Sequence, residues 1–176
     1  HVDAPFVTKD YAVKHYEKQL KKHVLDRLNE VYGVNVSDDA LRKAIEKHNE
    51  LCRVVTEIGN YRKLKNPPLT GYEFHLIELV SECCPHDLIM PYLKETLEEL
   101  KTRVADEKPW YRVRVVLAGG ENDDPYFTKL IEDCGAFVVA DRYCFGSLPG
   151  REEIEIRDGE TAMNAIARHY IETNEC

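Results

Sequence analysis

The sequence has no apolar run long enough to cross a membrane. A transmembrane helix needs roughly 20 consecutive, predominantly apolar residues, and charged side chains interrupt every apolar stretch well before that length. The first ten residues include Asp3, Pro5 and Asp10 and contain no apolar core, so no secretory signal peptide is expected there. These absences predict a cytoplasmic protein without a membrane partner.

A basic surface for nucleic acid is also missing. The chain carries 32 acidic and 24 basic residues and a net charge of −8, without a Lys/Arg stripe interleaved with aromatic residues. Nucleic acid is therefore not expected as a partner. The sequence has no GxGxxG and no GKS/T motif either, so neither of the common phosphate-binding loops is present.

The cysteines do not form a compact metal motif. There is no CxxC and no HExxH among the 176 residues, which excludes the commonest zinc sites. Of the six cysteines, Cys52 and Cys134 lie in helical patterns and Cys83 and Cys84 are adjacent, so reduced thiols are expected rather than a disulfide scaffold. Cysteines from distant segments can still share an iron–sulfur cluster.

The first part of the chain has the 3.6-residue apolar spacing of helices. Helices are predicted over residues 9–32, from an N-cap at Ser37 to about residue 64, over 72–82 and over 87–105. The run NPPLTG at residues 66–71 must be a loop, because it is the strongest helix-breaking stretch in this half.

A βαβ unit is predicted in the second part of the chain. The apolar run from Val113 to Ala118 ends at two glycines and reads as a buried strand, and a second strand is expected over Ala136–Ala140. Between them, Pro125 suits the start of a helix and Gly135 its end. The crossover should be right-handed. A last helix is expected over 161–173.

The predicted fold class is therefore α/β. A helical region, 1–109, precedes a partial α/β domain, 110–176, in which the βαβ unit belongs to a parallel, flavodoxin-like sheet. Two parallel strands are too few for a stable sheet, so this sheet is expected to be incomplete.

Candidate binding residues cluster at the predicted carboxyl ends of the two strands, where open parallel sheets place their ligands. Gly119 and Gly120 could let backbone approach a phosphate or the pantetheine arm of coenzyme A, although a plain turn beside the acidic residues of the loop is the simpler interpretation. Gly146 and Ser147 are the cofactor-binding candidates of the second loop. Cys144 in that loop is either an iron–sulfur ligand, a substrate contact or a small buried residue.

Other polar residues are given structural roles. Asp141 and Arg142 are expected to pair and orient the second loop. His48 is interpreted as a packed histidine, and Asn49 forms an i, i+4 pair with Arg53 that could hold the helical region against the α/β part. The CCPH run at residues 83–86 is interpreted as structural.

The order and spacing of several motifs resemble the 2-hydroxyacyl-CoA dehydratase and benzoyl-CoA reductase family. They are HNELCR (48–53), NPPLTGYEF (66–74) and RVVLAGGENDD…FTKLIEDCGAFVVADRYCFGS (114–147). The resemblance covers nearly all of the chain and corresponds to the middle of a typical family subunit. Cys144 matches the family's Asp-x-x-Cys-x-Gly loop.

The resemblance implies an oxygen-sensitive iron–sulfur enzyme that acts on CoA thioesters by one-electron chemistry. The reaction would be dehydration of an (R)-2-hydroxyacyl-CoA or reduction of an aromatic acyl-CoA. The complete enzyme would carry a [4Fe–4S] cluster held by cysteines from separate segments. The implied partners are the acyl-CoA substrate, a homologous second subunit and an ATP-dependent activator protein.

Two other functions remain open at this point. The chain could be a non-catalytic scaffold or truncated subunit that packs against a catalytic partner, since it does not contain a full set of cluster cysteines in one motif. It could also be a flavodoxin-like nucleotide binder, although the acidic loop after the first strand opposes phosphate.

Overall fold

The computed structural model describes residues 1–105, 111–120, 122–142 and 152–173. They divide into a terminal unit, His1–Asn49 with Glu152–Cys176, and a central unit, Glu50–Arg151. The division expected from the sequence, between residues 109 and 110, separates helical from α/β residues. The compact units instead group residues by tertiary packing, so that the last helix joins the first one.

Helices of the central unit pack around one apolar core. They are the C-terminal part of α3 (Asp38–Asn60), the 3₁₀ turn η2 (Tyr61–Lys63), α4 (Gly71–Cys83) and α5 (His86–Thr102). The buried core residues are Val55, Ile58, Leu69, Phe74, Met90, Leu93, Leu97 and Leu100. Leu88 and Val104 share the helical spacing of the buried leucines of α5 but are exposed, because Met90 takes the inward position in the first turns of α5 and the helix ends before Val104.

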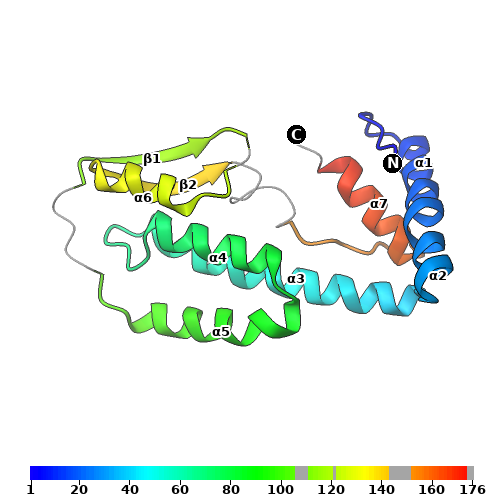
Figure 1. Cartoon of the computed structure of the whole chain (residues 1–176), viewed down its shortest axis with the longest axis horizontal. Helices are drawn as coiled ribbons and strands as arrows, with labels where there is room; N and C mark the ends of the chain where they lie inside the picture. Colours follow the sequence, from blue (N-terminus) through cyan, green and yellow to red (C-terminus); the bar gives the residue numbers. More distant parts are fainter. Residues whose placement is uncertain (106–110, 121, 143–151, 174–176) are drawn as a thin grey trace. The chain divides into compact units, whose positions relative to one another are not determined.

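The central unit also contains the predicted βαβ unit. Strands β1 (Val113–Ala118) and β2 (Ala136–Arg142) are parallel, and α6 (Pro125–Asp133) connects them. Gly135 has the left-handed φ of 95° that was expected after this helix. Figure 1 shows α4 between the sheet and α5, and α4 packs against both α6 and β2.

The second strand is longer than predicted. Asp141 and Arg142 were expected in the loop, but they pair in register with Leu117 and Ala118 and so belong to β2. Val115 precedes an irregularity in the register.

The sheet is incomplete, as the sequence predicted. In the described part of the chain it has two strands, and β1 leaves Val113 49% and Val116 64% exposed. Such exposure of β-branched residues is unusual for a strand of a parallel sheet, which is normally covered on both faces. Among the described residues, none of the helices combines the length and apolar character needed to span a bilayer.

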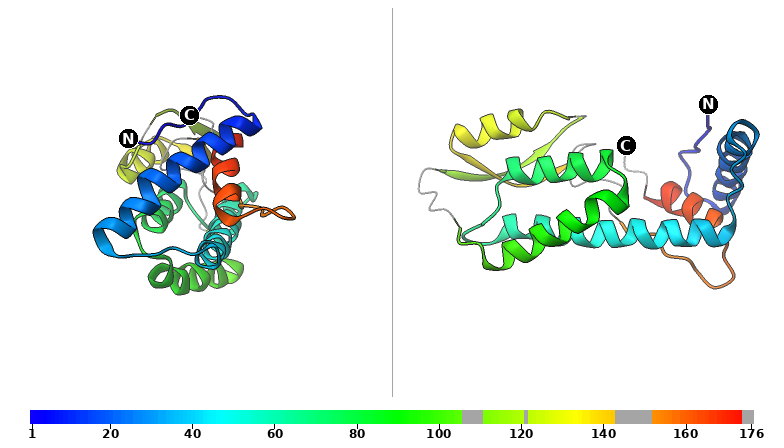
Figure 2. Two further views of the ribbon diagram at one scale, coloured as in Figure 1. Left: turned by 90° about the vertical axis from the view of Figure 1, so that its right-hand side faces the viewer. Right: turned by 60° about the horizontal axis from the view of Figure 1, so that its bottom comes forward.

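The terminal unit is helical. The helix predicted over 9–32 is formed by α1 (Asp10–Leu20), a π turn η1 (Lys21–Leu25) and α2 (Asp26–Tyr32), and α7 (Ala162–Glu172) packs against α1 (Figure 2). Ala12, Val13, Ala167 and Ile171 form the buried contact between α1 and α7. A second cluster joins Ile45 on α3 to Ile154, Ala162 and Ala165. Ser37 caps α3 as predicted, since its hydroxyl accepts a hydrogen bond from the Ala40 N–H at 3.2 Å.

Gly71 is required by close packing at the start of α4. A Cβ at this position would lie 2.6 Å from the Val138 Cβ and 3.0 Å from a Glu132 carboxylate oxygen. We expect Gly71→Ala to destabilise the protein by about 1–3 kcal/mol, because backbone must move to relieve this overlap. Gly119→Ala is the matched control, since no atom lies within 4 Å of its added Cβ. Urea unfolding measures both; equal midpoints for the two variants contradict the packing argument.

Candidate functional site

The candidate site lies at the carboxyl ends of β1 and β2. The Gly119 N–H donates to the Arg142 carbonyl at 3.1 Å, so the ladder continues past the end of β1 and the two strand ends lie side by side. Gly119 and Gly120 are exposed and have open space where a Cβ would be. Their role in binding stays a prediction. Cys144, Gly146 and Ser147 lie outside the described residues.

A buried ion pair fixes the end of β2. Arg62 of η2 donates through Nη1 to Asp141 at 2.7 Å, and each side chain is only 3% exposed. The Arg62 guanidinium also lies 3.8 Å from the ring centroid of Phe74, a cation–π contact. The expected partner of Asp141 was Arg142. Neighbouring residues of a strand project to opposite faces, however, and Asp141 is buried whereas Arg142 is exposed.

Strand β1 also bonds to the segment that contains Arg62. Arg114 of β1 donates to the carbonyls of Leu64 at 2.8 Å and of Arg62 at 2.9 Å. The backbone of Arg62 is therefore tied to β1 while its side chain is tied to β2. These contacts join η2 to both strands of the sheet.

A buried histidine connects α4 to the residues after β1. His75 is 2% exposed, its Nε2 lies 3.0 Å from the Asn122 carbonyl, and its Nδ1 lies 2.9 Å from the Thr128 hydroxyl. A carbonyl only accepts, so Nε2 carries the hydrogen and Nδ1 accepts from Thr128. Burial lowers the pKa of His75 below its ordinary value of 6.5, although Asp141 and Asp124 act in the opposite direction. The neutral ring satisfies both contacts.

A buried carboxylate accepts hydrogen bonds from backbone N–H groups at the start of α4. Glu132 of α6, 5% exposed, accepts from the backbone N–H of Gly71 at 2.9 Å, Tyr72 at 3.1 Å and Val138 at 3.2 Å. The capping box of Thr70 and Glu73 satisfies further N–H groups of the same helix end. Three elements, α4, α6 and β2, therefore meet on one side chain.

The protein's own carboxylates occupy the helix N-termini near the sheet. Asp124 caps α6 by accepting from the Tyr126 N–H at 2.9 Å, and Glu132 caps α4. A helix N-terminus attracts anions through its free N–H groups and its dipole. Because a carboxylate already fills this role at both ends, neither favours a phosphate.

Sequence reasoning did not identify the residues that build this support. Arg62, His75, Thr128 and Glu132 come from three different elements and belong to no common motif. The available signal was their polarity at positions surrounded by apolar residues, as for His75 in the run FHLIELV. Such a residue predicts a buried polar contact without naming its partner.

The described residues do not form a site for the implied iron–sulfur cluster. Among them, no group of three His, Cys, Asp or Glu side chains could hold a metal ion. Cys52 is buried, whereas Cys83 and Cys134 are exposed. Cys83 and Cys84 belong to no such group among these residues, and their structural role stays a prediction.

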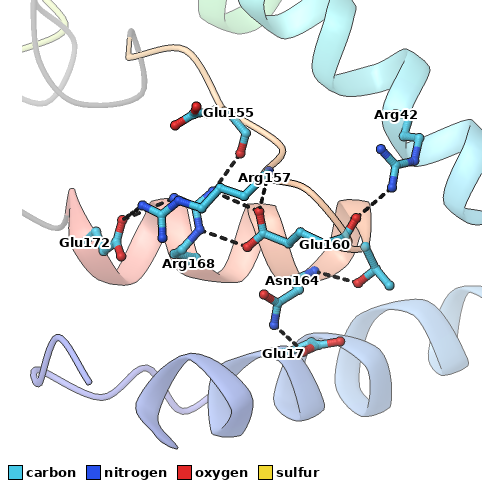
Figure 3. Close-up of polar contacts among 9 residues, drawn as sticks. Glu17, Arg42, Glu155, Arg157, Glu160, Asn164, Arg168 and Glu172 are labelled. Carbon is cyan, nitrogen blue, oxygen red and sulfur yellow. Dashed lines mark hydrogen bonds and ion pairs between the residues drawn. The ribbon is translucent and has the colours of Figure 1, made fainter. Parts of the chain in front are cut away.

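A second concentration of charge lies in the terminal unit. Figure 3 shows Arg168 of α7, which bonds to both oxygens of Glu160 at 2.9 and 3.0 Å, to Glu172 at 3.2 Å and to the Glu155 carbonyl at 2.7 Å. A cavity of about 230 Å³ beside it has basic and acidic lining residues: Lys9, Asp10, Lys14, Arg157, Glu160, Arg168 and Glu172. Opposite charges are nearly balanced there, and Arg168 is held by its own carboxylates.

The HNELCR motif also acts within the terminal unit. Asn49 donates to the Ile154 carbonyl at 2.9 Å and accepts from the Ile154 N–H at 2.8 Å, so its amide replaces a strand partner for this segment. The sequence had indicated a holding role for Asn49. Burial lowers the pKa of the neighbouring His48, which agrees with a packed histidine.

The buried pair of Arg62 and Asp141 generates a stability prediction. Removing one partner leaves a buried charge without its counterpart, so Arg62→Met and Asp141→Asn should each cost about 3–5 kcal/mol. The double variant should lose clearly less than the sum. Lys129→Met is the control, because its partner Asp133 is 2.6 Å away on an exposed surface and its loss should be much smaller. Additive losses in urea unfolding contradict a direct pair.

The Arg168 cluster predicts a pH dependence. Hydrogen bonds from Arg168 hold the pKa of Glu160 below its ordinary value of 4.5. A lowered pKa in the folded state stabilises the protein above that value, and the contribution is lost as pH falls through the folded pKa. Glu160→Gln should therefore be less stable at pH 7 and lose less stability below pH 4.5 than the original protein. Chemical unfolding at several pH values measures this, with Glu46→Gln, exposed on α3, as control.

Comparison with known proteins adds one finding. A comparison with curated proteins gives no match. A family model described as 2-hydroxyglutaryl-CoA dehydratase, D-component, matches residues 1–176. This match spans both units and confirms the resemblance that the motifs indicated. The chain therefore belongs to the 2-hydroxyglutaryl-CoA dehydratase D-component family.

Proposed function

We propose that this chain is part of a 2-hydroxyacyl-CoA dehydratase component whose substrate lies against the carboxyl ends of β1 and β2. The observation that carries the proposal is the family match over residues 1–176. The open backbone at Gly119 and Gly120 supports the choice of this edge, since no atom lies within 4 Å of a Cβ added at either glycine. The reaction removes water from an (R)-2-hydroxyacyl-CoA.

The residues of the chain would act by binding and by holding the edge in place. Backbone at Gly119 and Gly120 suits close contact with the acyl-thioester or pantetheine part, which is long and largely uncharged. The ion pair of Arg62 with Asp141 holds the end of β2, to which the Gly119 N–H is bonded. The phosphates of coenzyme A would bind elsewhere, because Asp124 already caps α6, the helix that begins beside this edge.

The complete enzyme would also contain a [4Fe–4S] cluster, which supplies one-electron chemistry when bound. The described residues do not provide its ligands. Cys144 is the candidate of this chain, and the other thiolates would come from further segments. We propose the same partners that the resemblance implies, namely a homologous second subunit and an ATP-dependent activator, in an anaerobic cytoplasmic complex. Reduction of an aromatic acyl-CoA is the variant reaction of this proposal.

The absence of a metal-binding group among the described residues favours one alternative. In it, the chain is a scaffold that packs against a catalytic partner and contributes neither a cluster ligand nor a substrate contact. Iron content separates the two functions.

The test is iron content, visible absorption and activity of the complex purified anaerobically with its neighbouring chains. The proposal expects stoichiometric iron, a broad band at about 400 nm from thiolate-bound iron, and ATP-dependent dehydration of a 2-hydroxyacyl-CoA. Cys144→Ala should lose most of the iron or the activity, while Cys83→Ala, an exposed thiol, should retain both. A complex that assembles without iron supports the scaffold, and reduction of benzoyl-CoA in place of dehydration identifies the variant reaction.

A further inference from the structure

His75 bonds to two elements besides its own helix. It lies inside α4, it accepts from Thr128 on α6, and it donates to the carbonyl of Asn122, which follows β1. The Asn122 side chain in turn accepts from the Asp124 N–H at 3.3 Å, and Asp124 caps α6. The imidazole therefore links α4 both to α6 and to the segment that precedes α6.

The arrangement is specific for a neutral imidazole. The groups that face it are Arg62 from η2, Asp141 from β2, and Asn122, Asp124 and Thr128 from the loop and α6. Arg62 and Asp141 neutralise one another. A protonated ring could not accept the hydrogen bond that Thr128 donates to Nδ1. A buried polar link of this kind costs desolvation that an apolar side chain would avoid. What it provides is a fixed position for the Asn122 carbonyl.

The fixed carbonyl lies two residues beyond Gly120. Gly119 is held on its other side by its hydrogen bond to the Arg142 carbonyl. The two exposed glycines thus lie between two hydrogen bonds. One joins Gly119 to the sheet, and the other joins Asn122 to His75. Without the second hydrogen bond, glycines with open space around them have little to restrict their backbone.

We propose that His75 is a positioning residue of the substrate site, which sets the backbone of Gly119 and Gly120 by donating from Nε2–H to the Asn122 carbonyl. This inference rests on the proposed function, in which the acyl-thioester part of the substrate lies against that backbone. His75 itself is buried and contacts no substrate.

The test compares two amide substitutions in the complete, active complex. His75→Gln can place an N–H donor near the position of Nε2, whereas His75→Asn is shorter and reaches only the position of Nδ1. We expect His75→Asn to raise KM for the acyl-CoA about tenfold with kcat within about twofold, which corresponds to the loss of one buried hydrogen bond. His75→Gln should keep KM within about twofold of the original protein.

Amide hydrogen exchange gives a readout that does not depend on activity. Exchange in the peptide that contains Gly119 and Gly120 should be about tenfold faster in His75→Asn and unchanged in His75→Gln. Thr128→Val is the control, because it removes the contact at Nδ1 and leaves the donor at Nε2. It should leave exchange in this peptide close to that of the original protein.

The outcomes separate this inference from the proposed function. If His75→Gln and His75→Asn change KM and exchange equally, the positioning role is overturned. It is also overturned if only His75→Asn exchanges faster but its KM does not change. An original complex that turns over no acyl-CoA overturns the proposed function, whereas the exchange contrast still shows whether His75 holds the turn. If neither variant folds, nitrogen chemical shifts of His75 in the original protein decide, and an Nδ1–H tautomer at neutral pH, which has no donor at Nε2, overturns the inference.

Discussion

A single buried carboxylate determines how the central unit is assembled. Glu132 accepts three backbone N–H groups, two from the start of α4 and one from β2, and it does so from the last turn of α6. Gly71 lies so close to Val138 and to this carboxylate that a Cβ cannot fit. The orientation of α4 on the βαβ unit follows from these contacts, and α4 in turn provides Phe74 to the core and His75 to the candidate site.

A carboxylate that accepts helix N–H groups also limits which ligands can bind at the carboxyl ends of the strands. In many open α/β sheets, the helix N-termini beside the strand ends are free and bind phosphate. Here Asp124 accepts the N–H group at the start of α6, so a phosphate would meet negative charge there. The exposed glycine backbone carries no such charge and suits an uncharged, extended ligand. The pantetheine and acyl parts of an acyl-CoA are of this kind.

Strand β1 leaves apolar side chains exposed. Val113 and Val116 are exposed on β1 although both are β-branched and apolar. A parallel sheet of two strands does not have the buried area of a stable sheet. Exposed apolar side chains of this kind are typical of a surface that contacts another protein.

The sequence by itself determined the local elements. Apolar periodicity, the NPPLTG breaker, Pro125 and Gly135 located the helices and strands to within a few residues, because these signals act through neighbouring backbone. It also determined the edge of the sheet where Gly119 and Gly120 lie, since parallel strands place their carboxyl ends together. The family followed from the order of motifs along the chain.

Only the tertiary structure decided the partners of the polar residues. Asp141 was assigned to Arg142, its neighbour in sequence, but bonds to Arg62, 79 residues away. Glu132 and His75 gave no local sign of the N–H groups and the carbonyl that they contact. These contacts are long-range, and their geometry exists only after α4, α6 and β2 have packed. Periodicity reports which side of an element is buried, whereas the hydrogen bond that satisfies a buried polar atom depends on what the rest of the chain places opposite it.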